Sequence, residues 1–290
     1  MAVPVQLFAH QFLWRLCAVA ALALLSLGFA AGHCLAGERS ASADAARKVR
    51  ALQLNAAATG IVMGWGVVNW DYFQQSPKAK PEGWFGNNTD SGGADKLGHL
   101  YSGYALTHLW DYLYRDLGYA EKDAARLGAL SALGVTGLME LGDSFSNFGF
   151  SYEDMLMNIA GSALGYLFLS DAELAKKIDF RIEYSLNLGG HFEADVVTDY
   201  QHLKYLLAIQ AEGFESIENR YLNYLELQLG YYTRGYDGHG AETIDRRERN
   251  LYAGIGINLG KLLAPLWKTR LFDYVQLPYT YLAADRDLND

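Results

Sequence analysis

The chain has 290 residues, of which 51% are hydrophobic, and its 24 Lys+Arg against 33 Asp+Glu give a formal net charge of −9. This composition suffices for a buried core and excludes an intrinsically disordered chain. The acidic balance, without any long basic run, excludes general binding of DNA or RNA. Two cysteines are too few for a disulfide framework or a four-thiolate metal site.

The first predicted element is a secretory signal. Leu16 to Ala31 is an almost unbroken apolar run that follows Arg15. This pattern predicts a signal peptide over residues 1–36 and a polar linker over residues 37–50. The protein is therefore expected to be exported, to the periplasm or the outer membrane. The same run is long enough to cross a bilayer, so an uncleaved inner-membrane anchor is the alternative.

Residues 51–170 are predicted to form a helical domain rich in Ala, Leu and Gly. The expected helices cover about Ala51–Trp70, Ala94–Leu117, Glu121–Leu141 and Ser151–Leu169. They are apolar on most of their circumference, so they are either core helices of a compact bundle or membrane spans. Gly161 and Gly165, four residues apart, predict the close approach of another helix.

The next segment, residues 180–284, is rich in tyrosine and alternates between apolar and polar residues, which is typical of strands. Five candidate strands cover Phe180–Leu188, Val196–Glu212, Arg220–Arg234, Asn250–Lys261 and Leu271–Leu282, and there are six if the second is split. A self-contained transmembrane barrel needs about eight strands. The sequence therefore predicts an α+β fold, an N-terminal apolar helical bundle followed by an antiparallel β-sheet or partial β-barrel, with one sheet face able to meet lipid.

Three consecutive predicted helices each carry polar residues three or four positions apart in otherwise apolar sequence. These residues are Asp95 and His99 with Lys96 between them, Glu140 and Asp143, and Asp154 and Asn158. Residues at this spacing lie on one face of a helix, and charges in apolar helices are costly unless they pair. The side chains are therefore expected to converge.

Two interpretations of this cluster remain open. In the first it is a site, with His99, Asp95 and Glu140 as acid/base residues, or with Asp95, His99, Glu140, Asp143 and Asp154 as ligands of a divalent metal. In the second it is a structural hydrogen-bonded network of Asp95, Lys96, His99, Glu140, Asp143, Asp154 and Asn158 that fixes helix register. No spacing matches a strong metal signature, so the sequence favours the network and predicts no cofactor.

The string Asp95-Lys96-x-x-His99, then Glu140-x-x-Asp143, then Gly149-Phe150-Ser151-x-x-Asp154-x-x-x-Asn158 resembles the YfiM-like family of predicted periplasmic lipoproteins and, more distantly, the VanZ-like membrane proteins. The resemblance covers about Trp84 to Leu167. It implies a bacterial envelope protein with a small helical domain and no established activity. A lipoprotein signal has a small residue directly before its cysteine, whereas Cys34 follows His33.

These observations favour a non-enzymatic, structural or lipid-contacting role at the membrane. The expected partners are membrane lipid or other envelope proteins, and the pattern is compatible with an oligomer. One alternative is a hydrolase or transferase that acts on an envelope lipid or cell-wall fragment with the Asp/His/Glu cluster. Another is a subunit of an outer-membrane assembly whose strands complete a partner's sheet.

Overall fold

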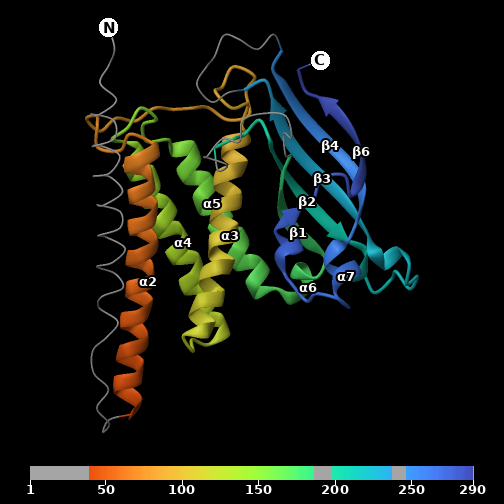
Figure 1. Ribbon diagram of the computed structural model, residues 1–290, viewed down its shortest axis with the longest axis horizontal. Helices are drawn as coiled ribbons and strands as arrows, with labels where there is room; N and C mark the ends of the chain where they lie inside the picture. The colour runs from red at the N-terminus through yellow and green to blue at the C-terminus, as the bar shows by residue number, and fades with distance from the viewer. Residues whose placement is uncertain (1–38, 186–197, 237–245, 290) are drawn as a thin grey trace.

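The computed structural model describes residues 39–185, 198–236 and 246–289, and the predicted signal peptide lies outside them. Four long helices stand beside a curved sheet (Figure 1). The helices are α2 (Arg39–Asn69), α3 (Ala94–Asp116), α4 (Glu121–Asp143) and α5 (Tyr152–Ser170), followed by the short α6 (Ala172–Ala175). The α+β class is confirmed.

The segment predicted as a polar linker, residues 37–50, is helical from Arg39 onward because α2 begins there. The physical reason is composition: this stretch is rich in alanine with arginine and lysine, all strong helix formers, and has no proline or glycine after Arg39. The polar residues of this stretch are therefore part of the helix and do not interrupt it.

The helical bundle is built on α3, which packs against both α4 and α5, while α2 packs on α4. Glycines allow α3 and α5 to approach closely. A Cβ on Gly161 would lie 2.1 Å from Leu100 O, and one on Gly165 would lie 2.7 Å from Thr107 Cβ. The predicted close helix approach at Gly161 and Gly165 is confirmed, and its partner is α3 of the same chain.

The sheet has six strands in the order β5-β1-β2-β3-β4-β6 and is open. All neighbours are antiparallel except β5, which runs parallel to β1. The strands are β1 (Ile178–Tyr184), β2 (Leu203–Gln210), β3 (Leu225–Arg234), β4 (Glu248–Ile257), β5 (Val275–Gln276) and β6 (Tyr281–Asp287), with the short helix α7 (Leu259–Leu263) after β4. The sixth strand arises because the last predicted strand divides into β5 and β6, not because the second one does.

In most sheets of soluble proteins the buried face is apolar and the exposed face is polar. This sheet has the opposite arrangement. Along β3, Leu225, Leu227 and Leu229 are exposed, whereas Glu226 and Gln228 between them are buried. β4 repeats the pattern, with its leucine and isoleucines outward. The polar face is therefore the inner one.

The sheet curls strongly around that polar inner face. Lys204 Nζ on β2 lies 2.9 Å from the Tyr281 hydroxyl on β6, although β3 and β4 lie between these strands. In a flat sheet three strand spacings amount to about 14 Å. Within the curl, Arg181 contacts Glu226 at 2.8 Å and Gln276 at 3.0 Å, so buried polar groups satisfy one another across strands.

The helix α3 contacts the sheet at β1, β2 and the neighbouring part of β3. Phe180 on β1 packs against Tyr101 and Tyr104 of α3, with ring centroids 5.5 and 5.6 Å apart. Tyr205 on β2 joins the same aromatic cluster. Near the end of β3, Tyr231 is covered by the loop before α3, through its bond to Gly92 O and its ring contact with Phe85, whereas Leu227 and Leu229 on β3 and Leu251 and Ile255 on β4 stay exposed.

Candidate functional site

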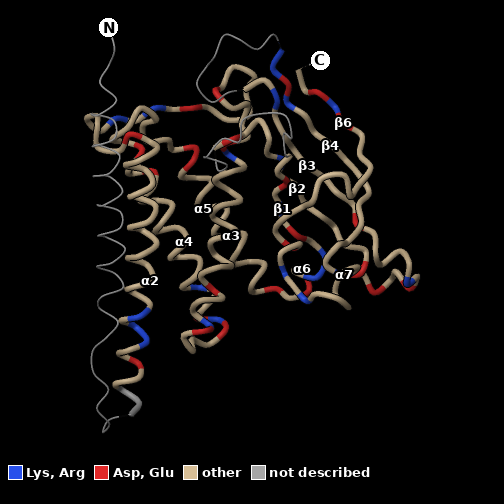
Figure 2. The backbone as a smooth tube through the Cα atoms, viewed as in Figure 1, with Lys and Arg blue, Asp and Glu red and all other residues tan. Residues whose placement is uncertain are grey.

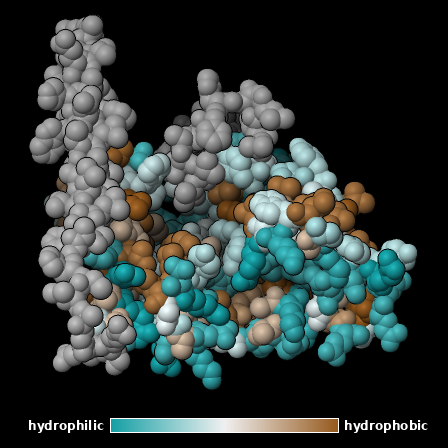
Figure 3. All heavy atoms as spheres, turned by 60° about the horizontal axis from the view of Figure 1, so that its bottom comes forward, coloured by the Kyte–Doolittle hydropathy of each residue, from teal (hydrophilic) through white to brown (hydrophobic). Residues whose placement is uncertain are grey.

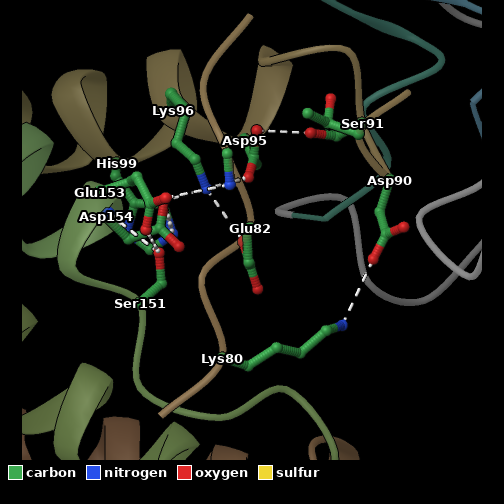
Figure 4. Close-up of polar contacts among 12 residues, drawn as sticks. Lys80, Glu82, Asp90, Ser91, Asp95, Lys96, His99, Ser151, Glu153 and Asp154 are labelled. Atoms are coloured by element: carbon green, nitrogen blue, oxygen red, sulfur yellow. Dashed lines mark hydrogen bonds and ion pairs between the residues drawn. The ribbon is translucent and has the colours of Figure 1, made fainter. Parts of the chain in front are cut away.

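Three helix ends meet at one end of the bundle and bring the predicted polar residues together. Figure 4 shows Lys96, His99 and Asp154 in this cluster. α3 begins directly after Gly92 and Gly93, whose φ values of +65° and +89° turn the chain into the helix. α5 begins at the cap Ser151, whose Oγ accepts the Asp154 N–H at 3.2 Å. The last turn of α4 supplies Glu140.

Lys96 is the positive centre of the first half of the cluster. Its ammonium lies 2.5 Å from Asp95, 2.7 Å from Asp154 and 2.9 Å from Glu82, and the side chain is 1% exposed. Burial alone would lower the pKa of Lys96, but the three carboxylates outweigh it and raise this pKa. Burial raises the pKa of Glu82 to about 8, even though Lys96 opposes that shift.

His99 forms the second half of the cluster, with a carboxyl group on each side of its ring. Nδ1 lies 3.2 Å from Glu140 Oε1 and 3.3 Å from Asn158 Oδ1, and Nε2 lies 3.7 Å from Asp154 Oδ1. The Asn158 amide also donates to Glu140 Oε1 at 3.2 Å. The predicted convergence of the three helices is therefore observed.

The two carboxyl groups beside His99 differ in pKa. Burial, with the nearby Asp154 and Asp143, raises the pKa of Glu140 to about 9. For Asp154 burial acts in the same direction, but His99 and Lys96 outweigh it and lower its pKa. At neutral pH Glu140 is therefore protonated and Asp154 is ionised, a division of roles that suits either a fixed network or an acid and base pair.

Asp143 interacts with the hydroxyl of Tyr72, which also donates to Met139 O at 3.0 Å. Burial raises the pKa of Asp143 to about 7. Tyr72 is 2% exposed, and its ring fills the space beside Gly142. The structure thus places Asp143 at the edge of the cluster, between the helices and the segment that follows α2.

Sequence reasoning missed Glu82, Ser91 and Glu153. Glu82 contacts Lys96, the Ser91 hydroxyl donates to Asp95, and Glu153 accepts the Gly83 N–H at 3.0 Å. Two of these groups lie in the loop between α2 and α3, where no periodicity marks an inward side chain. The one available signal was Glu82 itself, an acidic residue between Pro81 and Gly83 in this loop.

Two sets of three side chains in the cluster lie close enough together to be compared with a metal site. Ligand atoms of His99, Glu140 and Asp154 lie within 4.8 Å of one another, as do those of Glu82, Asp95 and Asp154. The second set already surrounds the Lys96 ammonium. In the first set Glu140 faces Nδ1 and Asp154 faces Nε2, whereas a metal ion binds one ring nitrogen. As it stands, the arrangement fits a hydrogen-bonded ion-pair network better than one shared ion.

The fold and the cluster together define an α+β protein whose helical half carries a buried polar network and whose sheet turns its apolar face outward. Residues 81–170 match a family described as predicted periplasmic lipoprotein (DUF2279), which has no known activity. No curated protein and no solved structure matches the chain. The matched segment contains every residue of the cluster and ends before the sheet, so the family resemblance is confirmed for that segment and suggests an exported envelope protein.

Proposed function

We propose that the protein is an envelope component that contacts a lipid bilayer through its apolar outer surface. The observation that carries this proposal is the reversed sheet. Leu229, Leu251 and Ile255 are 44%, 49% and 60% exposed, while Glu226 and Gln228 are buried. Large contiguous apolar surfaces are unfavourable in water, and strands with an apolar outer and a polar inner side are typical of membrane-facing sheets.

The distribution of charge supports the same proposal. Outside β1, most Lys, Arg, Asp and Glu lie near the ends of the helices and strands, and the middle parts of these elements are mostly uncharged (Figure 2). Hydrophobic side chains also reach the surface beside hydrophilic ones on the face shown in Figure 3. Two helical stretches, Ser42–Asn69 and Glu121–Asp143, have the length and composition of a membrane span, a test that core helices also pass.

Exposed aromatic residues lie at one end of the sheet. Tyr221 precedes β3, Trp267 follows α7, and Tyr279 joins β5 to β6; their exposed fractions are 72%, 55% and 99%. The register pairs Leu225 with Ile257, so the start of β3 and the end of β4 share this end. Tyrosine and tryptophan are enriched where a protein meets the membrane–water interface.

Vesicle flotation tests the proposal. We expect the purified protein to float with phospholipid vesicles. The triple variant Leu229→Asn/Leu251→Asn/Ile255→Asn should partition to them at least ~10-fold less, because burial of each of these side chains in the bilayer contributes about 1 kcal/mol or more. Leu288→Asn, at a 39% exposed residue beyond β6, is the matched control and should float like wild type. Equal flotation of the triple variant, with its circular dichroism unchanged, would contradict lipid contact by the sheet.

A second candidate, a hydrolase or transferase on an envelope lipid or cell-wall fragment, is supported by the opposite pKa shifts of Glu140 and Asp154 on the two sides of His99. His99→Ala separates it from the network. The network predicts a loss of about 1–3 kcal/mol in the free energy of unfolding, because buried partners lose their contacts. The enzyme predicts unchanged stability with loss of function in cells. Lys122→Ala, at an exposed residue of α4 outside the cluster, is the control.

A further inference from the structure

Three arginines, Arg247, Arg249 and Arg286, form an arginine rim on the outer face of the sheet, at the end where β4 begins and β6 ends (Figure 2). Arg286 lies directly opposite Leu251 of β4, and Arg249 precedes Leu251 by two residues. Directly opposite side chains share a face of a sheet, and so do side chains two residues apart along a strand. Arg247 directly precedes β4. The arginine rim therefore continues the apolar outer face that Leu251 and Ile255 form.

The acidic residues of the same strand ends belong to the other face of the sheet. Asp285 lies opposite Tyr252, and Asp287 lies opposite Asn250. Tyr252 and Asn250 are buried on the inner face, so the two aspartates share that face. Glu248 precedes Asn250 by two residues and belongs to the inner face as well. The alternation of the strands therefore holds these acidic groups away from the arginine rim.

The positive charge of the arginine rim is not neutralised by a carboxylate of the described chain. Arg247 Nη1 donates to Asn87 O at 3.3 Å, and Arg249 Nη1 donates to Phe85 O. These carbonyl groups orient the two guanidinium groups and do not cancel their charge. Arg286 is exposed, and within the described residues its side chain forms neither a hydrogen bond nor an ion pair. Three like charges next to one another thus remain available to an anionic partner.

Phosphate groups at a membrane surface are the partner that fits both the charge and the neighbouring apolar face. A guanidinium group binds phosphate through two parallel hydrogen bonds. In a bilayer the headgroup layer lies directly beside the hydrocarbon region, so the rim can meet headgroups while Leu251 and Ile255 meet hydrocarbon. A soluble polyanion on the arginine rim would leave that apolar face in water, which is unfavourable. The geometry therefore favours lipid.

We propose that Arg247, Arg249 and Arg286 bind the phosphate groups of anionic lipid headgroups while the apolar outer face of the sheet lies against the bilayer. This inference rests on the lipid contact proposed above, and it adds the class of lipid and the end of the sheet that lies at those headgroups. The whole chain has a net charge of −9, so general electrostatic attraction does not draw it to an anionic membrane. A preference for anionic lipid therefore requires a local basic site.

Flotation of the full chain with two kinds of vesicle tests the arginine rim. One kind is pure phosphatidylcholine, and the other also contains the anionic lipid phosphatidylglycerol. We expect stronger partitioning to the anionic vesicles at low salt, and a preference that falls as salt rises. Arg286→Gln should weaken partitioning to the anionic vesicles about 5-fold and leave the neutral ones unchanged. Arg126→Gln, at an exposed arginine of α4, removes the same charge and is the matched control, with the wild-type preference expected.

The triple variant Arg247→Gln/Arg249→Gln/Arg286→Gln should lose the preference for anionic vesicles altogether. If it fails to fold, Arg286→Gln decides alone, because that side chain has no contact to lose within the described chain. Equal flotation of wild type with both kinds of vesicle overturns this inference and leaves the lipid contact of the sheet intact. No flotation with either kind contradicts the lipid contact itself. Binding of soluble polyphosphate without a vesicle preference identifies a soluble polyanion and overturns the assignment to lipid.

Discussion

The Lys96 ammonium lies 2.7 Å from Asp154 Oδ1, and this contact joins the first turn of α3 to the first turn of α5. Asp154 also faces His99, so one carboxylate receives both basic groups of the cluster. The two halves of the network are therefore coupled through Asp154, and a change in either half is expected to alter the other.

Lys96→Met should strongly destabilise the protein. It leaves Asp95, Asp154 and Glu82 close together without their shared cation, and removal of one partner from a buried ion pair costs about 3–5 kcal/mol. Urea unfolding followed by circular dichroism measures the change. Lys122→Met, at an exposed lysine in the first turn of α4, is the control and should stay within about 0.5 kcal/mol of wild type. A loss below about 1 kcal/mol for Lys96→Met would mean that the three carboxylates are not held by this lysine.

Stability should fall as pH rises from about 5 to about 9. Glu140 and Glu82 have pKa values raised to about 9 and about 8 by burial, so the folded state binds more protons than the unfolded state in this range. The stabilisation from a raised carboxyl pKa is complete below the unfolded value and is lost as pH passes the folded value. Urea midpoints measured across this range check the slope.

Glu140→Gln is the matched variant for that pH profile, because the amide keeps the shape of the side chain and cannot ionise. Its stability should fall less steeply between pH 5 and 9 than that of wild type, with the remaining slope due to buried carboxyls whose pKa is also raised, among them Glu82, Asp143 and Asp179. Identical slopes in the two proteins would show that Glu140 is not protonated in the folded state at neutral pH.

Much of the helical site was predictable because helices impose a period. Asp95, His99, Asp154 and Asn158 stand at spacings that put them on one face, and their cost in apolar sequence predicts that they meet. Glu82 obeys no such rule, because the path of a loop is set by what it packs against. The partner of Lys96 from the loop could therefore not be named in advance.

The strands show a different limit. The alternation expected for strands is present in β3, with Leu227 and Leu229 on one face and Glu226 and Gln228 on the other. Alternation alone does not say which face is covered, since that depends on how the whole sheet curls. The curl brings together residues that are far apart in the sequence, such as Lys204 and Tyr281, and no local pattern encodes such a contact.

Elemental analysis by inductively coupled plasma mass spectrometry should find no near-stoichiometric metal bound to the purified protein. The expectation rests on the positions of Glu140 and Asp154 at opposite nitrogens of His99 and on the Lys96 ammonium among the remaining carboxylates. The double variant Asp95→Ala/His99→Ala measured alongside gives the background. A metal retained by wild type and lost from this variant would contradict the network and favour the enzyme.

Gly161→Ala should separate α3 from α5 and destabilise the bundle. The added Cβ would lie 2.1 Å from Leu100 O, a backbone atom that cannot move alone, so the helices must shift at a cost of about 1–3 kcal/mol or more. Gly134→Ala in α4 is the matched control, because nothing lies within 4 Å of its Cβ, and there the better helix propensity of alanine should stabilise the protein by about 0.5–1 kcal/mol. Opposite signs in thermal unfolding of the two variants are expected. Since Leu100 follows His99 directly, Gly161→Ala should also flatten the pH profile of stability. Gly134→Ala should leave the shape of that profile unchanged. A stable Gly161→Ala protein with the wild-type profile would show that the close contact between α3 and α5 does not position the cluster.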